Sequence, residues 1–282
     1  MDQLRRVYLA RIAMSTAITH SATLLGDRAP LCDPPRVASA PRQKAPVGAT
    51  DCHFHMLGPP DKYKLSPARG YTSPPEVNIE NYLAMADTLG LQRMVIVQPA
   101  AYGTDHACTL DSIEILGRHR AKAISAIDES FSQEALRDMD RRGVCGARIN
   151  AVTINGIGLN QLQPVARLIA PFGWHIQIFV DGSTLPELMP TLLSLPVPIV
   201  IDHMGRIPAD RGINHPEFQA LLHLLDSGKC WVKLCGYRNS SAGPPYADLL
   251  TAAQKIIQAA PGKMCLGHRL ATYEYVWATF TG

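Results

Sequence analysis

The chain of 282 residues has little charge, few aromatic side chains, no long apolar run and no paired-cysteine pattern. The formal net charge is only +3 and aromatic residues make up 6% of the sequence, so neither a basic face nor a stacking platform for nucleic acid is present. No segment approaches the roughly 18 consecutive apolar residues that a transmembrane helix needs. We therefore expect a soluble protein with neither a nucleic acid nor a membrane as its partner.

The seven cysteines are scattered singly and are odd in number, which predicts a reducing, cytoplasmic setting without a disulfide scaffold. Cys230 and Cys235 stand closest to a pair, but their spacing is not that of a zinc knuckle. We interpret them as small core residues.

Residues 1–45 differ in character from the rest of the chain, because arginines alternate there with prolines and small residues and acids are few. The segment resembles a transit sequence in its lack of acids, but its apolar stretch is too broken for a secretory signal. A start assigned too early, with Met14 as the true initiator, explains it equally well. We rank a disordered or misassigned leader above a targeting signal.

Beyond this leader, short apolar runs alternate with amphipathic segments of helical length, a pattern typical of repeated β/α units and a parallel sheet. The absence of a composition break favours one (β/α)8 TIM barrel over residues 46–266, and no glycine-rich phosphate loop follows the first strand. The predicted strands are Ala49–His55, Arg93–Pro99, Ala121–Asp128, Gly146–Asn150, His175–Val180, Pro198–His203 and Cys230–Gly236. The predicted helices are Glu76–Leu89, Asp105–Leu116, a helix capped by Ser132 that runs to Arg142, Leu159–Ala170, Thr184–Leu193, Glu217–Leu225 and Tyr246–Ala259.

The first predicted strand ends in two histidines, His53 and His55, one residue apart. Alternate residues of a strand face the same side, so the two imidazoles can serve one site. In parallel α/β folds the carboxyl ends of the strands carry ligands and catalytic groups. If each strand ends at the barrel mouth, the following residues become neighbours: His53, His55, Gln98, Arg148, Gln177, His203 and Lys233.

Several of these residues have both a functional and a structural interpretation. Arg148 is a costly buried cation unless it meets an anion, either a substrate carboxylate or a structural partner. Lys233 alternates with apolar neighbours, so its ammonium is expected inside the barrel, where a salt bridge explains it nearly as well as substrate binding. Tyr71, Tyr237 and Arg238 lie in loops that could cover the mouth, although a surface position is the default for loop tyrosines.

Six short motifs follow one another along the chain: Asp51–His55, Gln98–Pro99, Tyr102–Asp105, Gly146–Asn150, Asp202–Arg206 and Trp231–Leu234. In this order they resemble amidohydrolase family 2, and within it the 2-pyrone-4,6-dicarboxylate lactonase group. The resemblance implies a (β/α)8 barrel, a hydrolase acting on a lactone or a similar carbonyl compound, and a site carried by His53, His55 and His203. It also implies that Arg148 contacts a substrate carboxylate. Some members bind zinc through the His-x-His pair, whereas the pyrone lactonase branch works without a metal.

The resemblance also implies a general base, an aspartate within a Thr-Asp-Trp-Pro-His motif after strand eight, and this motif is missing. The codons GGC CAC CGA CTG GCC ACA TAC GAG would encode Gly267 to Glu274, and read one nucleotide later they encode Ala-Thr-Asp-Trp-Pro-His-Thr. We therefore predict a frameshift near Leu266, an out-of-frame tail over residues 267–282 and an eighth β/α unit that is aberrant or missing. Impaired activity, open strand edges and poor solubility are the expected consequences.

Three functions remain open from the sequence. The first is a hydrolase of a carboxylated lactone that works with or without a metal. The second is a metal-dependent decarboxylase with His53, His55 and His203 as zinc ligands. The third is a catalytically dead protein, either a pseudogene product or a non-catalytic binder. The sequence does not reveal the oligomeric state.

Overall fold

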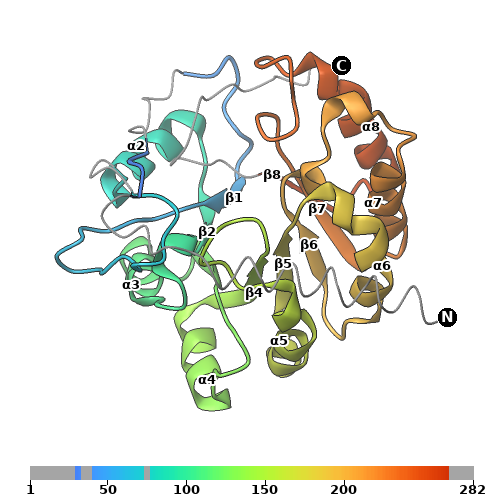
Figure 1. Ribbon diagram of the computed structural model, residues 1–282. Coiled ribbons are helices and arrows are strands. Elements are labelled where there is room, and N and C mark those ends of the chain that lie inside the picture. Colours follow the sequence, from blue (N-terminus) through green and yellow to red (C-terminus); the bar gives the residue numbers. More distant parts are fainter. Residues whose placement is uncertain (1–28, 33–39, 73–76, 267–282) are drawn as a thin grey trace.

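A computed structural model describes residues 29–32, 40–72 and 77–266 of the protein. Its centre is a sheet of eight parallel strands that follow one another in sequence order and curl into a nearly closed barrel (Figure 1). The predicted barrel is confirmed. The strands are β1 (Thr50–Phe54), β2 (Arg93–Val97), β3 (Ala121–Ser125), β4 (Val144–Asn150), β5 (His175–Phe179), β6 (Ile199–Ile201), β7 (Cys230–Leu234) and β8 (Met264–Leu266).

Seven helices lie between successive strands and cover the outside of the barrel in the described part of the chain (Figure 1). Their buried residues recur at helical spacing and pack on the outer faces of the strands, which are therefore buried on both sides. The helices are α2 (Ile79–Leu89), α3 (Ala107–Leu116), α4 (Gln133–Arg142), α5 (Leu162–Ile169), α6 (Leu185–Ser194), α7 (Pro216–Asp226) and α8 (Leu250–Ala259).

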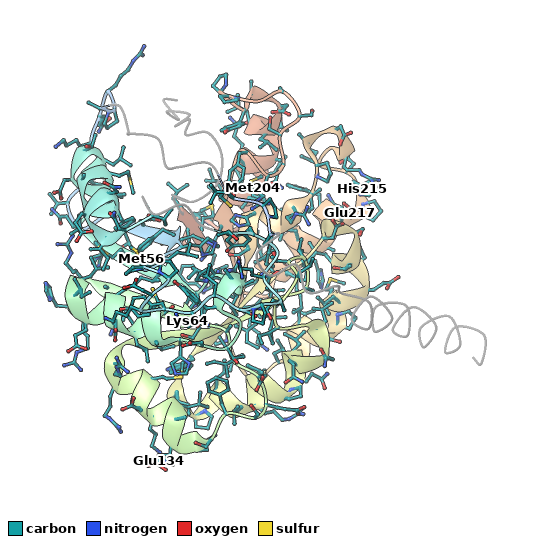
Figure 2. All side chains as sticks on the ribbon, turned by 60° about the vertical axis from the view of Figure 1, so that its left-hand side comes forward. Met56, Lys64, Glu134, Met204, His215 and Glu217 are labelled. Carbon is teal, nitrogen blue, oxygen red and sulfur yellow. The ribbon has the colours of Figure 1, made fainter. Side chains whose placement is uncertain are left out.

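Helix α4 begins and ends where its capping residues predict. The Ser132 side chain accepts a hydrogen bond from the Ala135 amide, and Gly143 adopts a left-handed conformation with φ of 106°. Helix α2 ends at Gly90, also as predicted, but it begins at Ile79 because Asn78 caps it. Figure 2 shows Glu134 in the first turn of α4, at the outer edge of the molecule.

Helix α7 begins beside His215, whose ring nitrogen accepts a hydrogen bond from the Glu217 amide. Figure 2 places both side chains at the periphery, away from the centre of the barrel. His215 is therefore the capping residue of α7. His215 is thus separate from the histidines at the strand ends.

The eighth strand is present but has only three residues. It pairs with β7 and lies beside β1, but within the described ranges no strand ladder joins β8 to β1. The prediction of an aberrant eighth unit is confirmed to that extent. The predicted tail at 267–282 and most of the predicted leader lie outside the described residues.

None of the helices in the described ranges combines the length and the apolar character that crossing a membrane requires.

Candidate active site

The two histidines predicted at the end of the first strand lie together and are almost completely buried. The ring centres of His53 and His55 are 5.1 Å apart in an edge-on arrangement. His55 Nδ1 lies 2.7 Å from the carbonyl oxygen of Val97, and Asp51 Oδ1 accepts a hydrogen bond from the His53 amide. Strand β2 and the preceding aspartate therefore fix the local geometry of the pair.

The third histidine, His203, lies in a left-handed turn, whereas the sequence predicted that strand six would extend to it. β6 ends at Ile201, and His203, Met204, Gly205 and Arg206 then have φ values of 52°, 50°, 68° and 53°. Residues other than glycine adopt this left-handed backbone conformation only at a cost in free energy. Backbone strain of this kind is concentrated at functional sites. The turn brings the His203 ring to 4.9 Å from the His53 ring.

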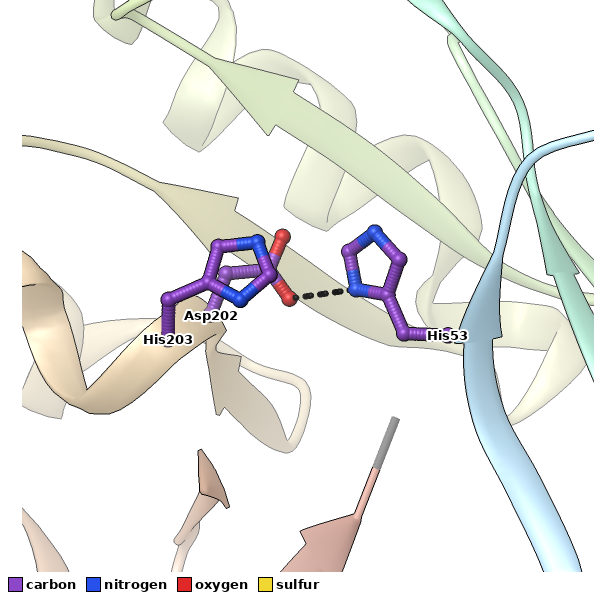
Figure 3. A group of neighbouring side chains, drawn as sticks. All are labelled: His53, Asp202 and His203. Carbon is purple, nitrogen blue, oxygen red and sulfur yellow. Dashed lines mark ion pairs between the residues drawn. The ribbon is translucent and has the colours of Figure 1, made fainter. Parts of the chain in front are cut away.

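Asp202 joins the two histidines, and the sequence analysis missed it as a site residue. Its Oδ1 lies 3.3 Å from His53 Nδ1, the ion pair drawn in Figure 3. Its Oδ2 accepts a hydrogen bond from Gln177 Nε2 at 3.0 Å and lies 3.5 Å from Arg148 Nη2. Burial alone would raise the pKa of Asp202, but Lys233, His203 and Arg148 lower it below its usual value. A carboxylate directly after an apolar strand and directly before His203 was the available signal.

Lys233 lies inside the barrel, as predicted, and it is held by protein groups. Its Nζ donates hydrogen bonds to the Cys52 carbonyl at 2.8 Å and to Gln177 Oε1 at 2.6 Å, and it lies 3.7 Å from Asp202 Oδ1. Burial lowers the pKa of Lys233, whereas Asp202 acts in the opposite direction. The structure thus shows the salt bridge across the barrel that the sequence left open.

Arg148 also has a protein partner, Asp202, so the structural ion pair that the sequence left open beside a substrate carboxylate is present. Arg148 Nη1 donates a hydrogen bond to the Gln98 carbonyl at 3.1 Å. The Gln98 side chain bonds to the backbone of the following loops, since its Nε2 donates to Gly103 O and Asp105 O and its Oε1 accepts from Ala126 N. In this structure Gln98 shapes the mouth of the barrel.

Next to this buried layer, three guanidinium groups, of which that of Arg148 is itself buried, lie around the ring of Phe179. The central carbons of Arg148, Arg206 and Arg238 lie 5.7, 5.6 and 5.6 Å from its centre. Arg238 Nε donates a hydrogen bond to the Tyr237 hydroxyl at 2.9 Å, so the predicted loop residues Tyr237 and Arg238 reach the mouth together. Sequence analysis missed Phe179 and Arg206 because a strand-end phenylalanine and a loop arginine carry no distinctive spacing.

The predicted residue Tyr71 lies outside this cluster, because it is half-buried and packs against the hydrophobic core. His175 opens β5 and thus lies at the opposite end of the barrel, where burial lowers its pKa to about 4.

The donors that could hold a metal ion differ from the predicted set. The ligand atoms of His53, Asp202 and His203 all lie within 4.8 Å of one another, so Asp202 takes the place predicted for His55. Nitrogen and carboxylate donors suit zinc. Asp202, however, already lies close to the cationic groups of Arg148 and Lys233, and a dication in the same place would be repelled by both. The surroundings therefore fit a resident divalent ion poorly.

Comparisons with known proteins agree with this architecture. The family model described as amidohydrolase matches residues 50–267. The chain is 31% identical over 241 residues to a 2-pyrone-4,6-dicarboxylate hydrolase from Comamonas testosteroni, covering 81% of this chain and 78% of that protein. It is 32% identical over 226 residues to a 4-sulfomuconolactone hydrolase from Hydrogenophaga intermedia, covering 79% and 74%. A crystal structure of an Agrobacterium tumefaciens protein superposes with a TM-score of 0.75 at 29% identity, covering 81% and 83%.

Proposed function

The chain belongs to the amidohydrolase family, a family with lactone hydrolases among its members, and from this premise we propose that it opens the ring of a carboxylated lactone. The observation that carries the proposal is the layering of the mouth. A buried group of His53, Asp202 and His203 lies next to a ring of three guanidinium groups around Phe179. The first layer suits ester hydrolysis, and the second suits an anionic substrate.

The substrate carboxylate is proposed to bind between Arg206 and Arg238. These two guanidinium groups flank Phe179 from partly exposed loops, whereas Arg148 is buried against Asp202. Guanidinium groups bind carboxylates with two parallel hydrogen bonds, which orients a planar ring as well as attracting it. Phe179, which is almost fully buried, holds the two guanidinium groups beside its ring. The relatives named above, which act on a dicarboxylate and on a sulfonated lactone, are consistent with an anionic substrate.

Lactone opening requires a water nucleophile, an acceptor for its proton and donors for the developing oxyanion. In our proposal His53 accepts the proton, because Asp202 at its Nδ1 orients the ring and stabilises the imidazolium that forms. His203 and Arg148 donate to the oxyanion. The ring C–O bond then breaks, and the leaving oxygen takes the proton back from His53. No step requires a metal.

The family resemblance places an additional aspartate after strand eight, and the described residues end at Leu266 without it. In the repaired chain this aspartate would assist His53 in activating the water, and a positioned acid–base group contributes on the order of 10²–10⁴ in rate. We therefore propose that the chain as written turns over slowly, and that the frame-repaired chain is faster by about that factor.

A metal-dependent decarboxylase is the second candidate, favoured by the three clustered donors His53, Asp202 and His203. In that case a divalent ion bound by these residues would act as the Lewis acid. The product distinguishes the two functions, since decarboxylation releases carbon dioxide and hydrolysis releases a ring-opened acid.

The test is a screen of lactones with and without ring carboxylates, run on the chain as written and on the frame-repaired chain, with and without chelator. We expect ring opening of carboxylated lactones that persists in chelator. His53→Asn and Asp202→Asn should lower kcat at least 100-fold, whereas His223→Asn, on the exposed face of α7, should not. Carbon dioxide release that stops in chelator would support the decarboxylase instead.

A further inference from the structure

Two neighbouring loops carry the two arginines proposed to bind the substrate carboxylate. Arg206 directly precedes Ile207 in the loop after β6, and Arg238 directly precedes Asn239 in the loop after β7. Strands β6 and β7 pair with each other, so both loops leave the same part of the barrel rim (Figure 1). The spacing of the two guanidinium groups therefore depends on what holds one loop against the other.

Asn239 joins the two loops. Its side chain is buried, and its Nδ2 donates a hydrogen bond of 2.9 Å to the carbonyl oxygen of Ile207. The Asn239 carbonyl oxygen accepts a hydrogen bond of 2.8 Å from the Ala209 amide. One residue thus bonds twice to the loop after β6, once with its side chain and once with its backbone.

The chemistry of asparagine suits this position. A backbone carbonyl oxygen can only accept, so the group that faces Ile207 must be a donor. The amide nitrogen of Asn239 is a donor, whereas an ionised aspartate of the same shape has none. The Asn239 backbone is itself fixed, because its amide donates to the Gly236 carbonyl at 3.1 Å.

Other contacts support each loop separately. Ser240 Oγ, in the loop after β7, donates to Asp248 Oδ1 at 2.7 Å. Arg206 Nη1 lies 3.6 Å from Asp181 Oδ2, which follows β5. Neither contact joins the loop after β6 to the loop after β7, and each involves an exposed carboxylate. The bonds of Asn239 are therefore the ones that relate Arg206 to Arg238.

We propose that Asn239 is a positioning residue of the carboxylate site, and that it holds Arg206 and Arg238 at the spacing at which both reach one substrate carboxylate. The inference rests on the proposed function, because it requires these two arginines to bind the substrate. Each guanidinium carbon lies 5.6 Å from the centre of the Phe179 ring. Binding by two guanidinium groups depends on their alignment, so a looser loop weakens it even when both arginines remain.

The experiment measures the affinity of the full chain for isophthalate, a planar ring with two carboxylates, and for its neutral diamide, by calorimetry. Arg238→Ala should weaken isophthalate binding by about tenfold or more, because a charged hydrogen-bond donor is lost. Asn239→Ala should weaken it by about five- to tenfold, because both donors remain but are misaligned. Affinity for the diamide should change less than about twofold in either variant.

Asn155→Ala is the matched control. Asn155 Nδ2 donates to the Ala100 carbonyl at 2.7 Å and so also joins two loops, those after β4 and β2, which carry neither arginine. Its removal should change the isophthalate affinity less than about twofold.

A double variant separates a positioning role from a merely structural one. In a chain that already carries Arg238→Ala, there is no pair of guanidinium groups left to align. Adding Asn239→Ala should then weaken isophthalate binding less than about twofold. A loss as large as in the parent chain would overturn the proposal.

The parent chain offers a measurement that does not depend on the variants folding. Isophthalate held by both loops should slow hydrogen exchange at the Ala209 amide, the donor to Asn239, by about fivefold in NMR spectra, and the diamide should not. Unchanged exchange would overturn the proposal, as would full affinity in Asn239→Ala beside a weakened Arg238→Ala. Full affinity in Arg238→Ala, or no binding by the parent chain, would overturn the carboxylate site itself and this inference with it.

Discussion

At the two ends of the barrel, the surroundings have opposite effects on the charge of an ionisable side chain. At the carboxyl end, Asp202 is buried between Arg148 and Lys233, and these cations hold the pKa of the carboxyl group below its usual value. At the amino end, burial lowers the pKa of His175 to about 4, so the imidazole is neutral at neutral pH. The carboxyl group of Asp202, where chemistry is proposed, therefore stays charged, whereas the imidazole of His175, at the packed end of the barrel, stays neutral.

The largest effect should follow from removing the anion at the carboxyl end. Asp202→Ala leaves Arg148 and Lys233 buried with no carboxylate between them, and breaking a buried pair in this way costs about 3–5 kcal/mol. Urea unfolding monitored by circular dichroism measures the loss. Asp138→Ala is the matched control, since its pair with Arg141 on α4 is exposed and its loss should cost less than about 1 kcal/mol. An equal loss in the free energy of unfolding for the two variants would contradict the expected difference between a buried and an exposed ion pair.

The amino end should give a pH-dependent effect of intermediate size. The folded-state pKa of His175, about 4, lies below the ordinary value of 6.5, so the unfolded chain takes up the proton first as the pH falls. Stability should therefore be lost between about pH 6.5 and pH 4, by at most roughly 3 kcal/mol. Unfolding midpoints across this range measure it. His175→Gln should flatten the pH dependence, and a slope identical to that of the parent chain would contradict the account.

A smaller effect is expected from crowding the amino end without any charge. Gly146 lies so close to β5 that an added Cβ would come within 2.9 Å of both the His175 carbonyl and Ile124 Cδ1. Gly146→Ala should therefore cost about 1–3 kcal/mol. Gly173→Ala serves as the spatial control, because nothing lies within 4 Å of its added Cβ; its φ of 66° adds a smaller backbone cost. Thermal melts measure both variants, and the melting temperature should fall further for Gly146→Ala than for Gly173→Ala.

Much of the fold could be predicted because its signals are local. The Ser132 cap and the Gly143 stop define α4 within a few residues, and alternation along β7 places Lys233 inside the barrel. The site was less accessible to such reasoning. The four partners of Asp202 come from four different strands. Their convergence at the barrel mouth could be predicted, but no spacing in the sequence shows that Asp202 is the residue that joins them.

The left-handed turn at His203 shows a second limit. Four successive residues of this turn have positive φ values, but only one of them, Gly205, is a residue that favours this conformation. The sequence therefore contains no glycine pattern that would predict the turn.

The most direct test of the central claim compares kcat/KM for a carboxylated lactone with that for its neutral methyl ester, using the frame-repaired chain in the presence of chelator. The account predicts ring opening in chelator and a preference for the carboxylate of at least 100-fold, which Arg238→Ala reduces about tenfold or more. Equal rates for acid and ester, or activity that disappears with chelator, would contradict it.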